Sequence, residues 1–247
     1  MTPRHTLATL EDRARLLAPA RRLRCRIVAE ALERFAAGRP FHVLDAGCGD
    51  GAFAEWIARH HPAWTIVGAD LADGLLDRGR RSAARRKIEN MEFVHADLTE
   101  DLGTEVYDAV AAIECLEEIP NDTQALQRMI AALRPGGLFV AHVPEHEWKP
   151  MLRGSAAAWK HEVRHGYDPV ELVARLTALG LESVQIDATC RGLVRLAQEL
   201  RERVPSRRPA LRALVSVSLL GAVWLERNGL TWGPGRALIV SARRPAR

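Results

Sequence analysis

The chain has 247 residues, of which 47% are hydrophobic, 27% charged and 5% aromatic, a balance that excludes a disordered, collagen-like or coiled-coil protein. Its four cysteines form neither a CxxC pair nor a short metal-ligand spacing, which argues against a disulfide framework and a zinc site and favours a reducing compartment. The formal net charge is +4, but it is unevenly distributed: residues 1–190 hold 23 Lys and Arg against 28 Asp and Glu, whereas residues 191–247 hold 12 against 3.

Helical and extended patterns alternate along the chain. Residues 10–35 have apolar positions at helical spacing, and the Ala-Ala-Gly-Arg-Pro run at 36–40 is expected to end this helix or helix pair. Short apolar runs then predict strands at 41–44, 65–69, 93–96, 109–113 and 138–143. Helices are expected between them at 52–60, 74–87 and 123–133, the last closed by Arg-Pro-Gly-Gly at 134–137. A helix at 171–179 and strands at 181–186 and 237–241 follow.

This alternation predicts an α/β fold, because strands separated by helices form βαβ units and a parallel sheet covered on both faces. No long linker interrupts the pattern, so a single domain spanning 1–247 is expected. Its predicted parts are an N-terminal helical cover, a core, a loop region and a helical insertion, at 1–39, 40–145, 146–170 and 188–235 respectively.

A glycine-rich loop follows the first predicted strand. Gly47, Gly49 and Gly51 alternate with other residues between an apolar strand and a helix, and Asp45 precedes them. Residues without a Cβ let a ligand lie against bare backbone at such a turn. The amides at the start of the following helix then face the ligand. The alternative is a tight turn that binds nothing.

Two carboxylates are expected at the same edge of the sheet as this loop. Asp70 ends the second predicted strand, 19 residues after Gly51, a spacing at which an acid can accept hydrogen bonds from ribose hydroxyls. Asp97 ends the third and could accept from the exocyclic amine of a base. Either residue alone could be a helix cap, but together they line the crevice where open α/β sheets bind ligands.

Five ordered motifs between residues 40 and 145 together resemble the class I S-adenosylmethionine-dependent methyltransferases of the small-molecule type. They are Asp45-x-Gly47-x-Gly49-x-Gly51, Asp70, Asp97, the block Tyr107 to Ile119 and Leu133-Arg134-Pro135-Gly136-Gly137. The resemblance implies a Rossmann-like doubly wound sheet of seven strands, with five parallel strands, two late strands and the last one antiparallel. It also implies methyl transfer from S-adenosyl-L-methionine to a small acceptor, with S-adenosyl-L-homocysteine as product.

The same resemblance implies roles for individual residues. Asp45, Gly47 and Gly49 would contact the amino-acid part of the cofactor, Asp70 the ribose, Asp97 with Leu98 the adenine, and Glu114 with Cys115 the methionine moiety. The predicted cofactor-binding residues are Asp45, Ala46, Gly47, Cys48, Gly49, Gly51, Asp70, Leu71, Asp97, Leu98, Glu114 and Cys115. Many small-molecule members have His at the position of Glu118, which leaves the role of that residue open.

The acceptor chemistry is expected in the loops outside the cofactor half. Histidine suits a general base near neutral pH, and His161 is favoured because its surroundings resemble the loop before the late helix of quinone-pathway O-methyltransferases. His146 and His165 are competitors, although His165 also precedes Asp168 and Pro169, which would cap a helix. A metal held by His161, His165 and Glu145 or Glu147 is an alternative, but no metal is predicted. The acceptor is expected to be a hydroxyl, with carbon or nitrogen acceptors and a non-methylating role such as cyclisation as alternatives.

Residues 190–235 separate the last two strands by far more than a hairpin requires. They contain two helical tracts, at 191–204 and 210–226, and the second combines many apolar residues with flanking arginines. A packed lid or dimer face is one interpretation, and contact with an anionic membrane or a lipid-like substrate is another. Nucleic acid is not expected as a partner, since aromatic residues are sparse. The first 20 residues lack a continuous apolar run, so a cytoplasmic protein is expected.

Overall fold

The computed structural model describes residues 19–152, 163–205, 207–218 and 220–246. These residues fall into two compact units. The sheet unit contains residues 27–146, 163–187 and 238–246. The helical unit contains residues 19–26, 147–152 and the described part of 188–237.

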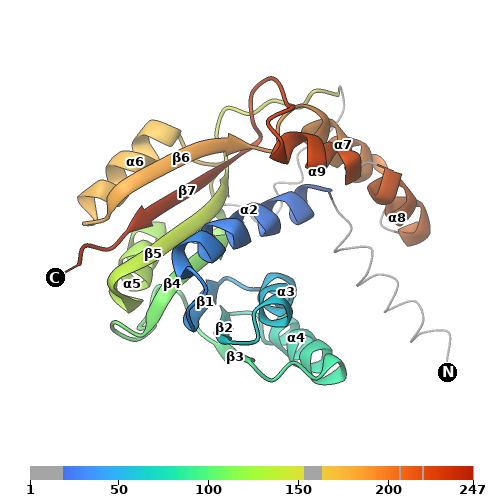
Figure 1. The fold of residues 1–247 in the computed structure, drawn as a ribbon. Coiled ribbons are helices and arrows are strands. Elements are labelled where there is room, and N and C mark those ends of the chain that lie inside the picture. Colours follow the sequence, from blue (N-terminus) through green and yellow to red (C-terminus); the bar gives the residue numbers. More distant parts are fainter. Residues whose placement is uncertain (1–18, 153–162, 206, 219, 247) are drawn as a thin grey trace. The chain divides into compact units, whose positions relative to one another are not determined.

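The helices and strands are drawn in Figure 1. The strands are β1 (Phe41–Ala46), β2 (Trp64–Asp70), β3 (Met91–His95), β4 (Tyr107–Ile113), β5 (Leu133–Pro144), β6 (Glu182–Thr189) and β7 (Ala237–Arg243). The helices are α2 (Pro19–Ala36), α3 (Ala52–His60), α4 (Asp73–Arg86), the short 3-10 helix η1 (Leu116–Glu118), α5 (Asp122–Ala132), α6 (Pro169–Ala178), α7 (Gly192–Arg203), α8 (Pro209–Ser218) and α9 (Leu220–Arg227).

The seven strands form one sheet in the order β3-β2-β1-β4-β5-β7-β6. The pairs β1·β2, β1·β4, β2·β3 and β4·β5 are parallel, and β7 is antiparallel. The predicted fold class is therefore confirmed: a Rossmann-like α/β sheet with five parallel strands and two late ones. The strand order reverses at β1, so the carboxyl ends of β1 and β4 lie beside each other at the edge where such sheets bind ligands.

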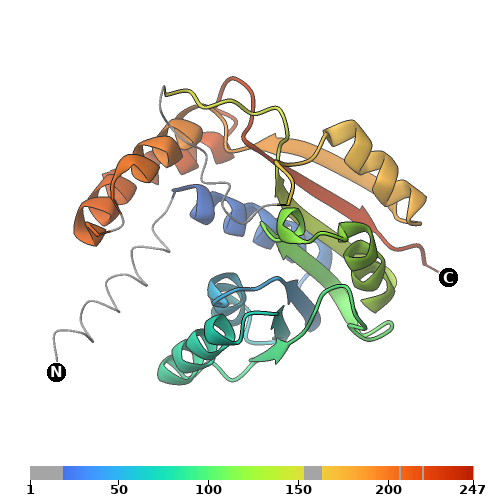
Figure 2. The ribbon, with the colours of Figure 1, turned by 180° about the vertical axis from the view of Figure 1, so that it is seen from behind.

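The central strands are buried on both faces, which is why they read as continuous apolar runs. Leu44 of β1, Ile66 of β2 and Phe139 of β5 are all less than 2% exposed. From opposite viewpoints, Figures 1 and 2 show α3 and α4 on one side of the sheet and α5 and α6 on the other. This layering holds the loops at the carboxyl ends of the strands in fixed positions.

The fifth strand begins earlier than predicted. The Arg-Pro-Gly-Gly run at 134–137 was expected to close a helix and lead into a strand at 138, whereas β5 already begins at Leu133. Tyr107 pairs with Leu133 and Ala109 with Leu138, so the run is an irregularity inside the strand pair. The physical reason is that a bulge accepts Pro, which has no N–H to donate, and a Gly with positive φ, as Gly136 has at 74°.

The second late helical tract was predicted as one helix over 210–226. Its described residues are all helical, in α8 up to Ser218 and in α9 from Leu220, and residue 219 lies outside the described residues. Of the predicted N-terminal helix, only the part from Pro19 onward lies among the described residues.

Candidate functional site

Backbone sterics dictate the glycines of the loop after β1. Gly47, Gly49 and Gly51 have φ of 71°, 58° and 69°, a region that L residues avoid. A Cβ on Gly47 would lie 2.4 Å from the Cβ of Cys115, and a Cβ on Gly51 would lie 2.3 Å from the ring of Phe93. A Cβ on Gly49 would meet nothing closer than 4.0 Å. Two of the glycines therefore permit tight packing of the loop on its neighbours, and Gly49 leaves open space beside the chain.

Asp70 holds this loop to the end of β2. One carboxylate oxygen accepts the main-chain N–H of Gly49 at 2.7 Å and the other accepts that of Ala72 at 2.8 Å. Each carboxylate oxygen can accept more than one hydrogen bond. Asp70 thus fixes the glycine loop and the start of α4 while it also lines the pocket described below.

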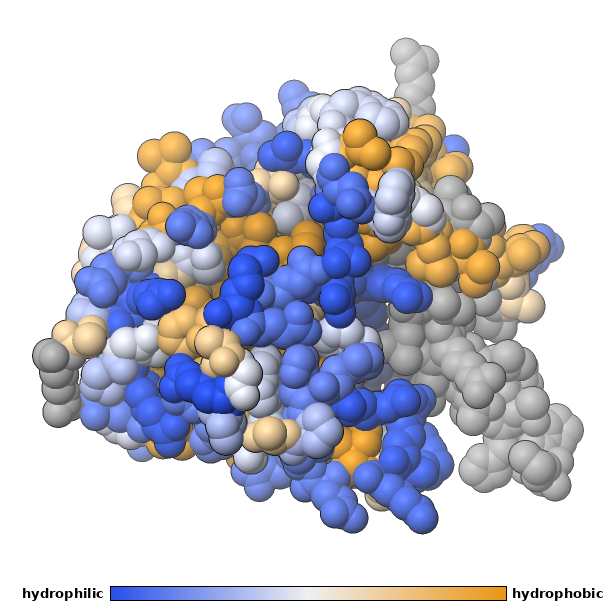
Figure 3. Space-filling view, in the orientation of Figure 1, coloured by the Kyte–Doolittle hydropathy of each residue, from blue (hydrophilic) through white to orange (hydrophobic). Residues whose placement is uncertain are grey.

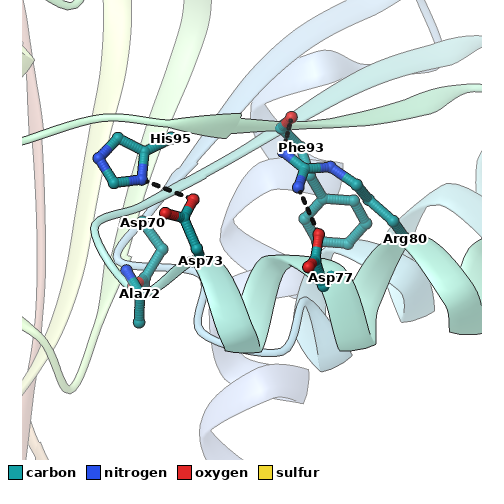
Figure 4. Close-up of polar contacts among 7 residues, drawn as sticks. All are labelled: Asp70, Ala72, Asp73, Asp77, Arg80, Phe93 and His95. Atoms are coloured by element: carbon teal, nitrogen blue, oxygen red, sulfur yellow. Dashed lines mark hydrogen bonds and ion pairs between the residues drawn. The ribbon is translucent and has the colours of Figure 1, made fainter.

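The first turns of α4 are fastened to β3, as Figure 4 shows beside Asp70. Asp73 lies 2.8 Å from Nδ1 of His95. Arg80 donates to Asp77 at 2.9 Å and to the carbonyl of Phe93 at 3.0 Å. These contacts keep the amino end of α4 next to the ends of β2 and β3, and so fix one wall of the site.

Asp97 follows β3 and lies in a local turn. One of its oxygens accepts both the main-chain N–H of Thr99 at 2.8 Å and the Thr99 hydroxyl at 2.7 Å. These hydrogen bonds, the main-chain one first, hold the pKa of Asp97 below its ordinary value. The side chain is therefore an ionised acceptor at neutral pH.

A pocket of about 440 Å³ opens at this edge of the sheet. The structure brings six of the predicted residues around it: Gly47, Asp70, Leu71, Asp97, Leu98 and Cys115. Six further residues that were not predicted as binding residues complete the lining: Ala96, Thr99, Glu118, Ile119, Pro120 and Asn121. Glu118, whose role was left open, is thus a wall of the pocket.

The other predicted cofactor residues lie around the pocket without lining it. Asp45 and Ala46 are buried under the loop, and Cys48, Gly49 and Gly51 belong to the loop itself. Cys115 donates its S–H to the carbonyl of Ala46 at 3.2 Å.

Glu114 turns to a partner that the sequence did not suggest. It has a positive φ of 52°, and one carboxylate oxygen lies 2.9 Å from Nδ1 of His142, which is fully buried in β5. The main-chain N–H of Glu114 donates to the carbonyl of His142 at 2.8 Å. The signal that could have found His142 is a polar residue in an apolar strand, but its partner is visible only once β4 and β5 are paired.

Both thiols of the site are held in the neutral form. Burial, followed by the nearby charge of Asp45, raises the pKa of Cys48 far above its usual range. Burial, followed by Glu117 and Asp45, raises the pKa of Cys115 well above its usual range as well. Neither side chain is a nucleophile under these conditions, because the thiolate is the reactive form.

The segment after the undescribed residues 153–162 is anchored beside the pocket. The amides of Val163 and Arg164 donate to the carbonyl of Glu117 at 2.9 and 3.3 Å, and Glu117 adjoins the pocket residue Glu118. The amide of Tyr167 donates to the carbonyl of Pro144 at 2.9 Å. This segment therefore joins η1 to the end of β5.

A buried carboxylate organises the same segment. Asp122, which is 3% exposed, accepts from the Tyr167 hydroxyl and from Arg175, each at 2.8 Å, and pairs with Arg164 at 3.0 Å. Burial opposes ionisation of Asp122, but the hydrogen bonds from Arg175 and Tyr167 outweigh it and hold its pKa below the ordinary value. Burial and the hydrogen bond to Asp122 raise the pKa of Tyr167 far above its usual range, so the phenol remains protonated.

Two of the three histidines predicted as bases lie among the described residues. His161, the favoured one, lies outside the described residues. His146 is exposed, and its Nδ1 lies 3.4 Å from the carboxylate of Glu145. His165 is exposed on the anchored segment, and the Asp168 cap that follows it is confirmed, since the Asp168 side chain accepts the N–H of Glu171 at 2.8 Å.

His146 and His165 lie on two segments that pair with each other in the folded chain. Glu145 forms a parallel bridge with Tyr167, and the amide of His146 donates to the carbonyl of Tyr167 at 3.3 Å. Within the described part of the chain, no three His, Cys, Asp or Glu side chains gather to hold a metal ion. The end of β5 therefore offers an imidazole and a carboxylate group for proton transfer, on a segment that pairs with residues 163–167.

Comparison with known proteins points to one family. Residues 43–137 match the family model described as a methyltransferase domain. The chain is 25% identical over 212 residues to the trans-aconitate 2-methyltransferase of Acidovorax ebreus, covering 84% of this chain and 75% of the relative. It is 30% identical over 99 residues to the ubiquinone biosynthesis O-methyltransferase of Coxiella burnetii, covering 39% and 40% of the two chains.

Two solved structures share the fold. The Haemonchus contortus phosphoethanolamine N-methyltransferase 2, determined with S-adenosyl-L-methionine, has a TM-score of 0.63 at 17% identity, covering 87% of this chain and 51% of that one. The cyclase SpnF has a TM-score of 0.61 at 21% identity, covering 89% and 82%. At this level of identity the likeness concerns the fold alone.

Proposed function

Because this chain belongs to the class I S-adenosylmethionine-dependent methyltransferases of the small-molecule type, we propose that it transfers the methyl group to an oxygen, most directly a hydroxyl, of a small acceptor. The observation that carries the choice of oxygen is the pairing of His146 with Glu145 at the end of β5. A hydroxyl acceptor must lose a proton as it is methylated, whereas this requirement is weaker for an amine that is already neutral. The names of the ubiquinone O-methyltransferase relatives support the same choice.

The residues present fit the cofactor S-adenosyl-L-methionine. The glycine loop has the open backbone that a ligand needs at Gly49, and the side chains of Asp70 and Asp97 offer oxygen acceptors to hydroxyl and amine groups. Asp45 and Glu114 supply negative charge near the expected position of its cationic amino-acid end. When bound, the cofactor supplies an electrophilic methyl group on a sulfonium. We assign to Asp70 the ribose and to Asp97, with Leu98, the adenine.

His146 would act on the acceptor. The carboxylate of Glu145 beside Nδ1 favours the tautomer with its proton on that nitrogen, which makes Nε2 the basic one. Nε2 would take the proton of the acceptor hydroxyl as the methyl group passes from the sulfonium sulfur to the oxygen, and S-adenosyl-L-homocysteine would be the leaving group. Such proton transfer contributes about 10²- to 10⁴-fold to the rate. The hydrogen bonds of the Tyr167 main chain with Pro144 and His146 would hold this imidazole at the end of β5.

Product analysis tests this proposal. The purified chain is incubated with methyl-labelled cofactor and a panel of small hydroxylated acids, phenols and amines, and the methylated atom is located by NMR. Label on an oxygen supports the proposal. Label on carbon or nitrogen, or no transfer by a chain that binds the cofactor, refutes it.

Variants of the three histidines identify the base. H146Q should lower kcat by about 10²-fold or more while the KM for the cofactor is unchanged. H165Q and H161Q are assayed in parallel, and H60Q is the control because His60 is an exposed histidine on α3 whose Nδ1 lies 2.7 Å from the main-chain carbonyl of Trp56. An H146Q variant with full kcat would assign the proton transfer to another group.

A further inference from the structure

The outward face of α8, in the helical unit, is apolar. Leu211, Leu214 and Val217 recur every third residue and expose 40%, 66% and 50% of their surface. Ser216, on the opposite side of the helix, is fully buried, and its hydroxyl accepts from Nε of Arg201 at 3.1 Å. A surface helix of a globular protein normally turns its apolar side inward. Leu211, Leu214 and Val217 instead face solvent, which marks this face of α8 as a binding surface.

Other large apolar side chains of this unit are also exposed. Trp224 of α9 is 59% exposed, and Leu230 and Trp232, in the stretch after α9, are each 57% exposed. Both α8 and α9 pack on α7. Figure 3 shows hydrophobic residues gathered over this part of the chain with hydrophilic ones between them. Exposed tryptophan is typical of a membrane interface, where the apolar part of the ring contacts lipid and its N–H contacts water.

The charge at this surface is positive. Arg203 and Arg227 are exposed at the ends of α7 and α9, and Arg207 and Arg208 are exposed just before α8. Arg207 and Arg208 directly precede the apolar helix α8 in the chain. Exposed apolar side chains together with arginines suit a surface that has anionic headgroups outside and an apolar layer beneath them.

The acidic residues of α7 and α9 are turned to internal partners. Glu199 is fully buried and accepts the amides of Met151 and Leu152 at 2.9 and 2.8 Å. Glu202 pairs with Arg236 at 3.0 Å. Glu226 accepts the amide of Arg191 at 3.0 Å. Their carboxylates therefore do little to offset the arginines that face outward.

We propose that α8, with Trp224 and the arginines at its start, docks this protein on the surface of an anionic lipid bilayer. Helix α8 would lie in the plane of the interface, with Leu211, Leu214 and Val217 in the acyl region and the arginines at the lipid headgroups. No helix in the described part of the chain is long and apolar enough to cross a membrane. A second copy of this chain fits the surface less well, because two identical basic faces repel each other.

Vesicle sedimentation with the full chain tests the proposal. Vesicles of phosphatidylcholine with one third phosphatidylserine are compared with vesicles of phosphatidylcholine alone. Binding to the anionic vesicles, weakened by salt, is expected. L214Q and W224Q should each weaken it at least tenfold. The double variant R207Q/R208Q should weaken it about 25-fold, since each arginine near the surface contributes about fivefold.

The matched control is V170Q, since Val170 lies on α6 in the sheet unit and is 77% exposed. It should bind vesicles as the unaltered chain does. Circular dichroism confirms that each variant is folded. Absence of binding to anionic vesicles at low salt, or equal binding by L214Q and V170Q, overturns the proposal. So does ultracentrifugation that shows a dimer lost in L214Q while vesicle binding is unchanged, because the occupant is then a second copy.

Discussion

Replacing Gly47 by alanine should destabilise the sheet unit more than the same replacement at Gly38. Both glycines have positive φ, 71° and 79°, so alanine is strained at either position. They differ in surroundings: a Cβ on Gly38 meets no atom within 4 Å, whereas a Cβ on Gly47 lies 2.4 Å from the Cβ and 2.8 Å from the sulfur of Cys115. The comparison separates the backbone penalty from the steric one.

The magnitudes follow from these contacts. The left-handed conformation costs an L residue about 1 to 2 kcal/mol, which is the whole effect expected for G38A. Overpacking adds about 1 to 3 kcal/mol at Gly47, because the Cβ of buried Cys115 belongs to a fixed part of the side chain. G47A should therefore lose about 2 to 5 kcal/mol of unfolding free energy.

Urea unfolding followed by circular dichroism measures both variants. The G47A midpoint should fall below that of G38A by an amount worth about 1 to 3 kcal/mol, with a similar slope. If the two variants lose the same free energy, the contact between the glycine loop and Cys115 is not tight, and the account of the loop given above is wrong.

Two further predictions concern carboxylates. D70N should weaken cofactor binding at least tenfold in calorimetry, because its amide group places an NH2 where an oxygen now accepts a main-chain N–H, and it accepts fewer hydrogen bonds than a carboxylate. D187N, which changes an exposed carboxylate on β6, should leave the affinity unchanged. Y167F should lower the unfolding free energy by about 1.5 to 3 kcal/mol near neutral pH, since it removes a hydrogen bond to the ionised Asp122. Hydrogen bonds from Arg175 and Tyr167 lower the pKa of Asp122 in the folded protein. The stabilisation by this hydrogen bond is therefore complete above the pKa of Asp in the unfolded chain, about 3.9, and it is lost as the pH falls through the pKa of Asp122 in the folded protein. The difference between Y167F and the unaltered chain should shrink in that acidic range, and a difference independent of pH would contradict this assignment.

The sequence by itself determined the sheet and the position of the pocket. Helix α3 begins and ends where the pattern predicted, and the strands β1 to β4 are displaced by a few residues at most. This succeeds because a strand buried on both faces must be continuously apolar, and because a turn with positive φ restricts the choice to glycine. Asp70 and Asp97 could be predicted at the same edge of the sheet, since parallel strands bring their carboxyl ends to one edge.

The tertiary structure alone decided which side chains meet across distant segments. The pairing of Glu114 with buried His142, and the gathering of Tyr167, Arg164 and Arg175 around Asp122, join residues far apart in the chain. No local pattern encodes such contacts, because they depend on which strands are neighbours and on how each backbone turns. The outward apolar face of α8 was hidden for the same reason: a helical spacing of apolar residues defines a face, and only packing decides whether it turns inward or toward solvent.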